Sequence, residues 1–145
     1  MKSKVLNEAG ERTIALILDS GEEVMENLVR FVRDQNVNAA RFTAIGAFSE
    51  ATLGYFDVER KDYLRIAVDE QVEVLSLVGD VALEKDQPKI HAHVVLGKRD
   101  GSAHGGHLLS ARVRPTLEVI LVQSPSYLKR TYRPNIGLAL IDITA

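Results

Sequence analysis

The sequence predicts an α/β (α+β) fold, in which a central antiparallel or mixed β-sheet carries one main helix near residues 22–35. Three observations lead to this prediction. Apolar residues recur strongly at helical spacing in that one stretch. Almost everything after residue 40 consists of apolar, β-branched runs separated by polar turns. The length of 145 residues is that of a single domain, 1–145, and no linker or internal repeat divides it.

A strand and then the helix are predicted at the start of the chain. Residues 13–18 form a short branched apolar run, which is typical of a strand. Ser20 is predicted to cap the helix, with Glu23 completing a capping box three residues later. The helix is predicted to end around Asn36. Its apolar stripe consists of Val24, Met25, Leu28, Val29 and Val32.

The rest of the chain is predicted to form the sheet. Polar turns are expected at 59–62 and 84–89, and a loop with four glycines is expected between 97 and 106. Strands joined by such turns favour an antiparallel or mixed sheet with the helix packed on it. The predicted strands are 41–48, 51–58, 63–68, 71–83, 90–96, 107–113, 116–123 and 136–143.

Composition excludes several classes of protein. The chain has no Cys, which excludes disulfide scaffolds, thiolate metal sites and Cys nucleophiles, so any metal ligands must be nitrogen or oxygen atoms. The 18 Lys and Arg residues against 20 Asp and Glu give a net charge of −2, which argues against a chain that coats nucleic acid unaided. No signal-peptide pattern or long apolar run is present, so we expect a cytoplasmic protein without a membrane partner.

The four histidines are concentrated in one part of the chain. His91 and His93 are two positions apart, so a strand would place both on one face about 6–7 Å apart. The glycine loop then turns the chain back and brings His107 towards the pair. His104 lies inside the predicted loop and is expected to be a solvated loop residue.

Three neutral imidazoles with one open position form the kind of zinc site that activates water. The sequence therefore predicts that His91, His93 and His107 bind zinc or another divalent metal, or else a small polar or anionic ligand. The alternative interpretation is a polar strand face without any ligand. If the site is catalytic, we expect a metal-dependent hydrolase or hydratase.

One carboxylate stands out beside these histidines. Glu118 interrupts an otherwise apolar strand, and a carboxylate among apolar residues is costly to bury unless it is paired. It is a candidate fourth ligand, a partner that orients a histidine, or a general base. The alternative is a position at the rim, or a salt bridge with Arg112 or Arg114.

A second candidate site is the stretch 127–133, in which basic and aromatic residues alternate. Such a stretch can bind phosphates and stack bases, which makes Lys129, Arg130 and Arg133 candidate nucleic-acid ligands. The alternative is a solvated loop whose tyrosines cover the core.

The order of motifs along residues 12–143 resembles the PPC domain, named for its conservation in plants and prokaryotes, in its stand-alone prokaryotic form. Most specific is the combination of His91-Ala92-His93 with Gly105-Gly106-His107-Leu108. The other motifs that carry the resemblance are Ser20–Val24, Ala44–Phe48, Tyr55–Asp57, Glu73–Gly79 and Thr116–Val119.

This resemblance implies a compact α/β homotrimer with a central antiparallel sheet, and a metal site at the three matching histidines. In plants the domain follows AT-hooks in nuclear DNA-binding proteins and mediates assembly, whereas this chain has no AT-hook. Three functions follow as expectations. The first is a trimer that binds a metal or a small ligand. The second is a DNA-associated scaffold that presents three copies of Lys129, Arg130 and Arg133, and a plain assembly domain is a third.

Overall fold

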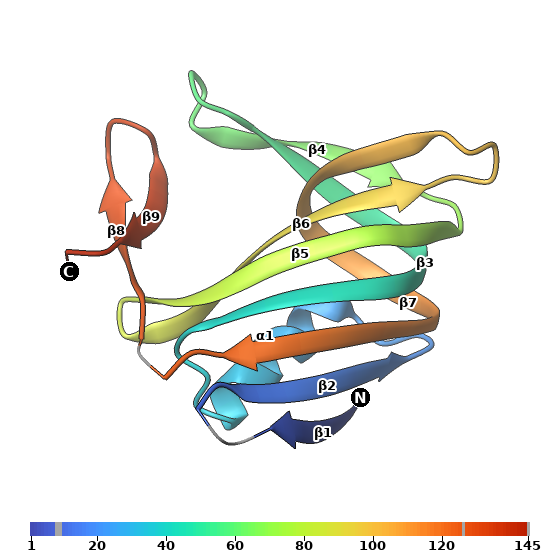
Figure 1. The fold of residues 1–145 in the computed structure, drawn as a ribbon. Helices are drawn as coiled ribbons and strands as arrows, with labels where there is room; N and C mark the ends of the chain where they lie inside the picture. Colours follow the sequence, from blue (N-terminus) through green and yellow to red (C-terminus); the bar gives the residue numbers. More distant parts are fainter. Residues whose placement is uncertain (8–9, 126, 145) are drawn as a thin grey trace.

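The computed structural model describes residues 1–7, 10–125 and 127–144, which form a sheet of nine strands with one helix on one face (Figure 1). All strand pairs are antiparallel except β5 with β8. The elements are β1 (Lys2–Asn7), β2 (Arg12–Asp19), α1 (Val24–Asp34), β3 (Ala40–Asp57), β4 (Asp62–Val68), β5 (Val72–Glu84), β6 (Gln87–Gly97), β7 (Ala103–Gln123), β8 (Lys129–Arg133) and β9 (Leu138–Asp142).

Four of these strands close into a ring. β3 pairs with both β5 and β7, and β6 pairs with both β5 and β7. The two long strands β3 and β7 make this possible because register shifts along their pairing let them bend. The ring brings the start of β7 alongside the end of β6, and these are the two segments that carry the histidines.

The core lies between the helix and the inner face of the strands. α1 contacts β6 and β7 and buries Leu28, Phe31 and Val32. Along β5 the side chains alternate, so that Leu77 is buried while Val78 is exposed. Burial of one such large apolar side chain contributes about 1.5–3 kcal/mol. The packed inner face therefore sets the register, and the register decides which residues share the outer face.

The predicted helix is confirmed, but its predicted cap is wrong. The helix begins at Val24, and Glu23 is its N-cap, accepting a hydrogen bond from the backbone N–H of Glu26 at 2.6 Å. Gly21 has a positive φ of 87° and pairs with Val113 of β7, so the segment around Ser20 is a turn outside the helix. Because this segment pairs with β7, the helix begins about one turn later in the sequence than predicted.

The predicted strands occur, but several are longer than predicted. Residues 41–48 and 51–58 belong to one strand, β3, and residues 107–113 and 116–123 belong to another, β7. A strand that bends at a bulge has a local sequence like that of a turn. The predicted strands therefore end where the observed strands bend and continue. The glycine loop shortens to residues 98–102, so His104 lies in β7 opposite Leu96 and not in a loop.

The fold class needs a similar correction. The described residues form a sheet with a single short helix, as predicted, but they are mostly β-sheet, so the label α/β overstates the helical part. Two strands, β1 and β8, fall where no strand was expected. Among the described residues, no helix has the length and apolar character needed to cross a membrane.

Candidate metal centre

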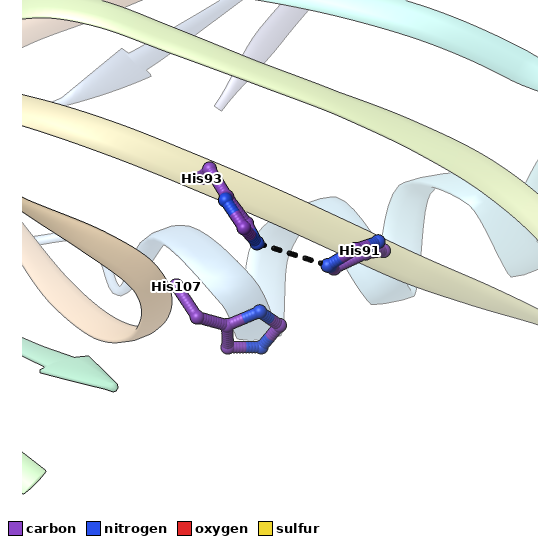
Figure 2. Close-up of side chains that lie close together, drawn as sticks. All are labelled: His91, His93 and His107. Atoms are coloured by element: carbon purple, nitrogen blue, oxygen red, sulfur yellow. Dashed lines mark hydrogen bonds between the residues drawn. The ribbon is translucent and has the colours of Figure 1, made fainter. Parts of the chain in front are cut away.

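Three histidine rings converge on the outer face of β6 and β7 (Figure 2). His93 lies directly opposite His107 across the two strands, and His91 lies two residues before His93 on the same face. The Nε2 atoms of His91 and His93 are 3.1 Å apart. One ring nitrogen from each of the three residues lies within 4.8 Å of the other two.

The donor set fits a zinc ion. Zinc binds histidine nitrogens at about 2.0–2.1 Å, so two ligand nitrogens in a tetrahedral site lie about 3.3 Å apart. The 3.1 Å separation of His91 and His93 is close to this value. His107 adds a buried Nδ1 that has no hydrogen-bond partner among the described residues. A buried polar atom without a partner is costly, so this ring is suited to taking a ligand.

Burial and mutual repulsion keep two of these rings neutral. The pKa of His107 is lowered from 6.5 to about 4, first by burial and then by the charges of His91 and His93. The pKa of His91 is also lowered, first by burial and then by His93, while the nearby Asp80 carboxylate acts in the opposite direction. Neutral imidazole is the form that binds a metal ion, so these two rings are available as ligands at neutral pH.

Tyr63 on β4 holds the His107 ring in place. Their ring centroids are 4.7 Å apart with an interplanar angle of 32°, and Tyr63 in turn packs edge-on against Phe56 at 5.1 Å. Gly54 lies opposite His107 in β3, and a side chain at Gly54 would overlap the Tyr63 ring. The glycine therefore allows the tyrosine to reach the histidine. Burial raises the pKa of Tyr63.

The carboxylate beside the histidines is Asp80, which the sequence analysis missed. Asp80 on β5 lies directly opposite His91 on β6, and it forms an ion pair with Arg130 of β8. Its position in a largely apolar stretch was the available signal. That it faces His91 depends on the register between β5 and β6, which no local pattern shows.

Glu118 lies elsewhere on the same outer face. It is exposed in β7, opposite Ile17 of β2 and Ile45 of β3. Between it and the β6 histidines lie β3 and β5, which amounts to three strand spacings or about 14 Å. The structure thus brings the three histidines together and does not bring Glu118 to them within one chain.

The predicted nucleic-acid residues are mostly engaged with other side chains. Arg130 has a side chain only 6% exposed and pairs with Asp80. Arg133 pairs with Asp142 at 2.9 Å. Lys129 lies 5.5 Å from the ring of Tyr127. The stretch 127–133, for which a solvated loop was the alternative interpretation, is largely a strand, β8.

Comparison with solved structures identifies close structural relatives. A plant- and prokaryote-conserved (PPC) protein from Pyrococcus horikoshii is 32% identical over 90% of this chain and 91% of its own, with a TM-score of 0.85. A protein from Archaeoglobus fulgidus described as metal-containing is 35% identical over 97% and 96% of the chains, with a TM-score of 0.83. A Bacteroides thetaiotaomicron protein, provisionally described as DNA-binding, is 26% identical over 99% of both chains, with a TM-score of 0.89.

Comparison with curated proteins finds no match. The sequence model of the Plants and Prokaryotes Conserved (PCC) domain matches residues 6–125, which include the whole histidine cluster. The similarity to the plant- and prokaryote-conserved protein of Pyrococcus horikoshii agrees with this assignment. The chain therefore belongs to the PCC (PPC) domain family.

Proposed function

We propose that this chain is a homotrimeric protein in which His91, His93 and His107 hold one zinc or other divalent metal ion, with a coordination position left for a small ligand. The observation that carries the proposal is the convergence of three ring nitrogens within 4.8 Å. The metal content described for the Archaeoglobus relative supports it. When bound, such an ion supplies Lewis-acid polarisation, which is the chemistry of hydrolases and hydratases.

The chain's own residues prepare this site. Tyr63 fixes the ring plane of His107, while the Asp80 carboxylate lies on the strand opposite His91 and favours its basicity. Partners that orient and polarise ligating histidines strengthen metal binding. A general-base function for Glu118 would require another subunit to bring that residue to the site, because β3 and β5 separate it from the β6 histidines within its own chain.

The trimer is proposed from the exposed apolar part of the outer face. Val78 of β5 and Ile120 of β7 both lie opposite Thr43 of β3, so they are on one face, and they are 49% and 42% exposed. Ile45 of β3, 60% exposed, continues the row. Contiguous exposed apolar residues on a sheet mark an interaction surface. We therefore assign these residues to the proposed subunit interface.

DNA association remains the second candidate function. The provisional description of the Bacteroides relative favours it. The ion pairs of Arg130 and Arg133 count against it, because a cation neutralised by its own chain releases few counterions from DNA.

The first prediction concerns metal content. Protein purified without a His-tag should contain about one zinc ion per chain by elemental analysis, because three imidazoles meet at a single point. The double variant His91→Ala/His93→Ala should lose the metal while keeping its β-sheet circular dichroism. The control His104→Ala, an exposed histidine outside the cluster, should keep it. Equal metal in wild type and double variant would show that the ligands lie elsewhere.

The second prediction concerns pH. The folded pKa of His107 is about 4 and its ordinary value is 6.5, so the unfolded chain binds more protons between these values. The stability of metal-free protein should therefore be complete above pH 6.5 and decline as the pH falls towards 4. Urea unfolding at stepped pH measures this decline. It should become shallower in His107→Gln and stay unchanged in His104→Gln; an unchanged slope in His107→Gln would contradict the assignment.

The third prediction concerns assembly. Sedimentation equilibrium should give three times the 16.0 kDa chain mass for the wild type. Val78→Glu/Ile120→Glu places charges on the proposed interface and should give monomers. Val58→Glu alters another exposed valine, which lies in the turn after β3, and it should leave the trimer intact. A trimer that survives the double substitution would place the interface elsewhere.

The fourth prediction concerns DNA. In a gel mobility experiment at low salt, micromolar protein should not retard duplex DNA, because two of the three candidate cations are paired internally. Retardation that weakens steeply with salt and disappears in Lys129→Ala/Arg133→Ala would instead favour the scaffold function.

A further inference from the structure

We propose that the cleft between the C-terminal hairpin β8–β9 and the histidine face binds a small carboxylic acid with a short apolar body. The carboxylate would lie on Arg130 and Lys89, and the far end of the ligand would reach His91 and His107. The inference deepens the proposed function by naming the class of ligand. It rests on that function for the part of the ligand that reaches the histidines.

The cleft has the size of a small-molecule site. Its volume is about 430 Å³, within the range of about 300–1,000 Å³ typical of ligand pockets. One wall is the outer face of the sheet, including His91, His107 and Tyr63. The other wall is the hairpin, including Arg130 and Leu138. The candidate metal ligands therefore open directly onto this space.

The hairpin is fixed over the cleft at its base and near its tip. At the base, the backbone N–H of Leu83 donates to the carbonyl of Leu128 at 2.6 Å. Near the tip, the Lys61 ammonium donates to the carbonyl of Pro134 at 2.7 Å. The family model matches residues 6–125, and the hairpin β8–β9 lies after them. The family match therefore assigns no function to the hairpin.

Arg130 is the residue that most strongly indicates an anionic ligand. Its side chain is 94% buried, its Nη2 donates to Asp80, and its Nε has no partner among the described residues. A guanidinium offers five N–H donors, and one carboxylate oxygen satisfies only part of them. Carboxylates match the planar geometry of this group, so a carboxylate ligand would complete its hydrogen bonding.

The charge balance of the cleft points the same way. Two cationic side chains, Arg130 and Lys89, are balanced by two carboxylates, Asp80 and Glu84, so the charged residues of the walls sum to about zero. A divalent cation on the histidines would add two positive charges to this set. An anionic ligand therefore suits the loaded site better than a cationic one.

The remaining walls are apolar and select the body of the ligand. Leu109 lines the sheet side, and Leu138, Ala139 and Leu140 line the hairpin side. Apolar surface next to a buried cation is the combination that retains an amphipathic acid and rejects its neutral analogue, because the neutral head leaves the guanidinium unsatisfied. We therefore expect a short-chain carboxylate and not a sugar or a polyamine.

The test compares hexanoate with hexanamide, which has the same carbon skeleton and no charge. Isothermal titration is run on metal-free and zinc-loaded wild type, on Arg130→Gln, and on the matched control Arg133→Gln from the same hairpin. Hexanoate should bind both wild-type forms at least about tenfold more tightly than hexanamide. Arg130→Gln should lose about tenfold or more of the affinity for hexanoate, and Arg133→Gln should not change it.

A second variant covers the case in which Arg130→Gln disturbs the hairpin. Leu138→Trp fills the cleft from the hairpin side, and it should abolish binding of both compounds while leaving zinc uptake intact. If the protein takes up zinc but neither substitution changes hexanoate binding, the carboxylate binds outside the cleft. That result would overturn the cleft proposal and leave the metal site standing. Failure to take up zinc while metal-free protein still binds hexanoate through Arg130 would instead overturn the metal function alone. No hexanoate binding in either form would overturn the cleft proposal.

Discussion

The pairing of the end of β6 with the start of β7 is the constraint on which the candidate site depends. This pairing places His93 directly opposite His107, and the alternation of strand side chains then adds His91 to the same face. A slip of one residue would turn one histidine from the outer face to the core. The buried residues of the same strands, among them Val94 and Leu108, hold the register because they cannot be moved to solvent without a large loss of apolar burial.

The two faces of the sheet thus have separate functions. The inner face, covered by α1, carries the stability of the fold, and the outer face carries the polar chemistry. On the outer face, the histidine cluster lies beside a row of exposed apolar residues that includes Val78 and Ile120, in register with His93. A subunit interface on that row would lie next to the candidate metal site, and assembly would then change the surroundings of the histidines.

Local patterns predicted a good part of this arrangement. The helix followed from apolar spacing, and the histidine cluster followed from the two-residue spacing of His91 and His93 together with a hairpin to His107. Both depend on contacts between residues close in sequence. Strand lengths were less accurate because β3 and β7 continue through bends that resemble turns.

What the sequence could not show depends on contacts between distant segments. Asp80, Tyr63 and Arg130 lie around the histidines, and they come from three different strands. Asp80 comes from β5, which pairs with β6, whereas Tyr63 comes from β4, which pairs with β3, and Arg130 comes from β8, which pairs with β5 and β9. Glu118 shows the converse limit, because the sequence pattern selected a residue that the fold places away from the histidines. It is an exposed polar residue on the correct face, and only the strand order places it away from the site.

The central claim is that three histidine nitrogens hold one metal ion. The most direct test is a crystal structure of zinc-loaded protein with anomalous diffraction measured on both sides of the zinc absorption edge. The account predicts one anomalous peak per chain at about 2.0–2.1 Å from a ring nitrogen of each of His91, His93 and His107. A zinc peak elsewhere, with these three rings keeping the 3.1 Å contact between His91 and His93 and no density between them, would contradict it.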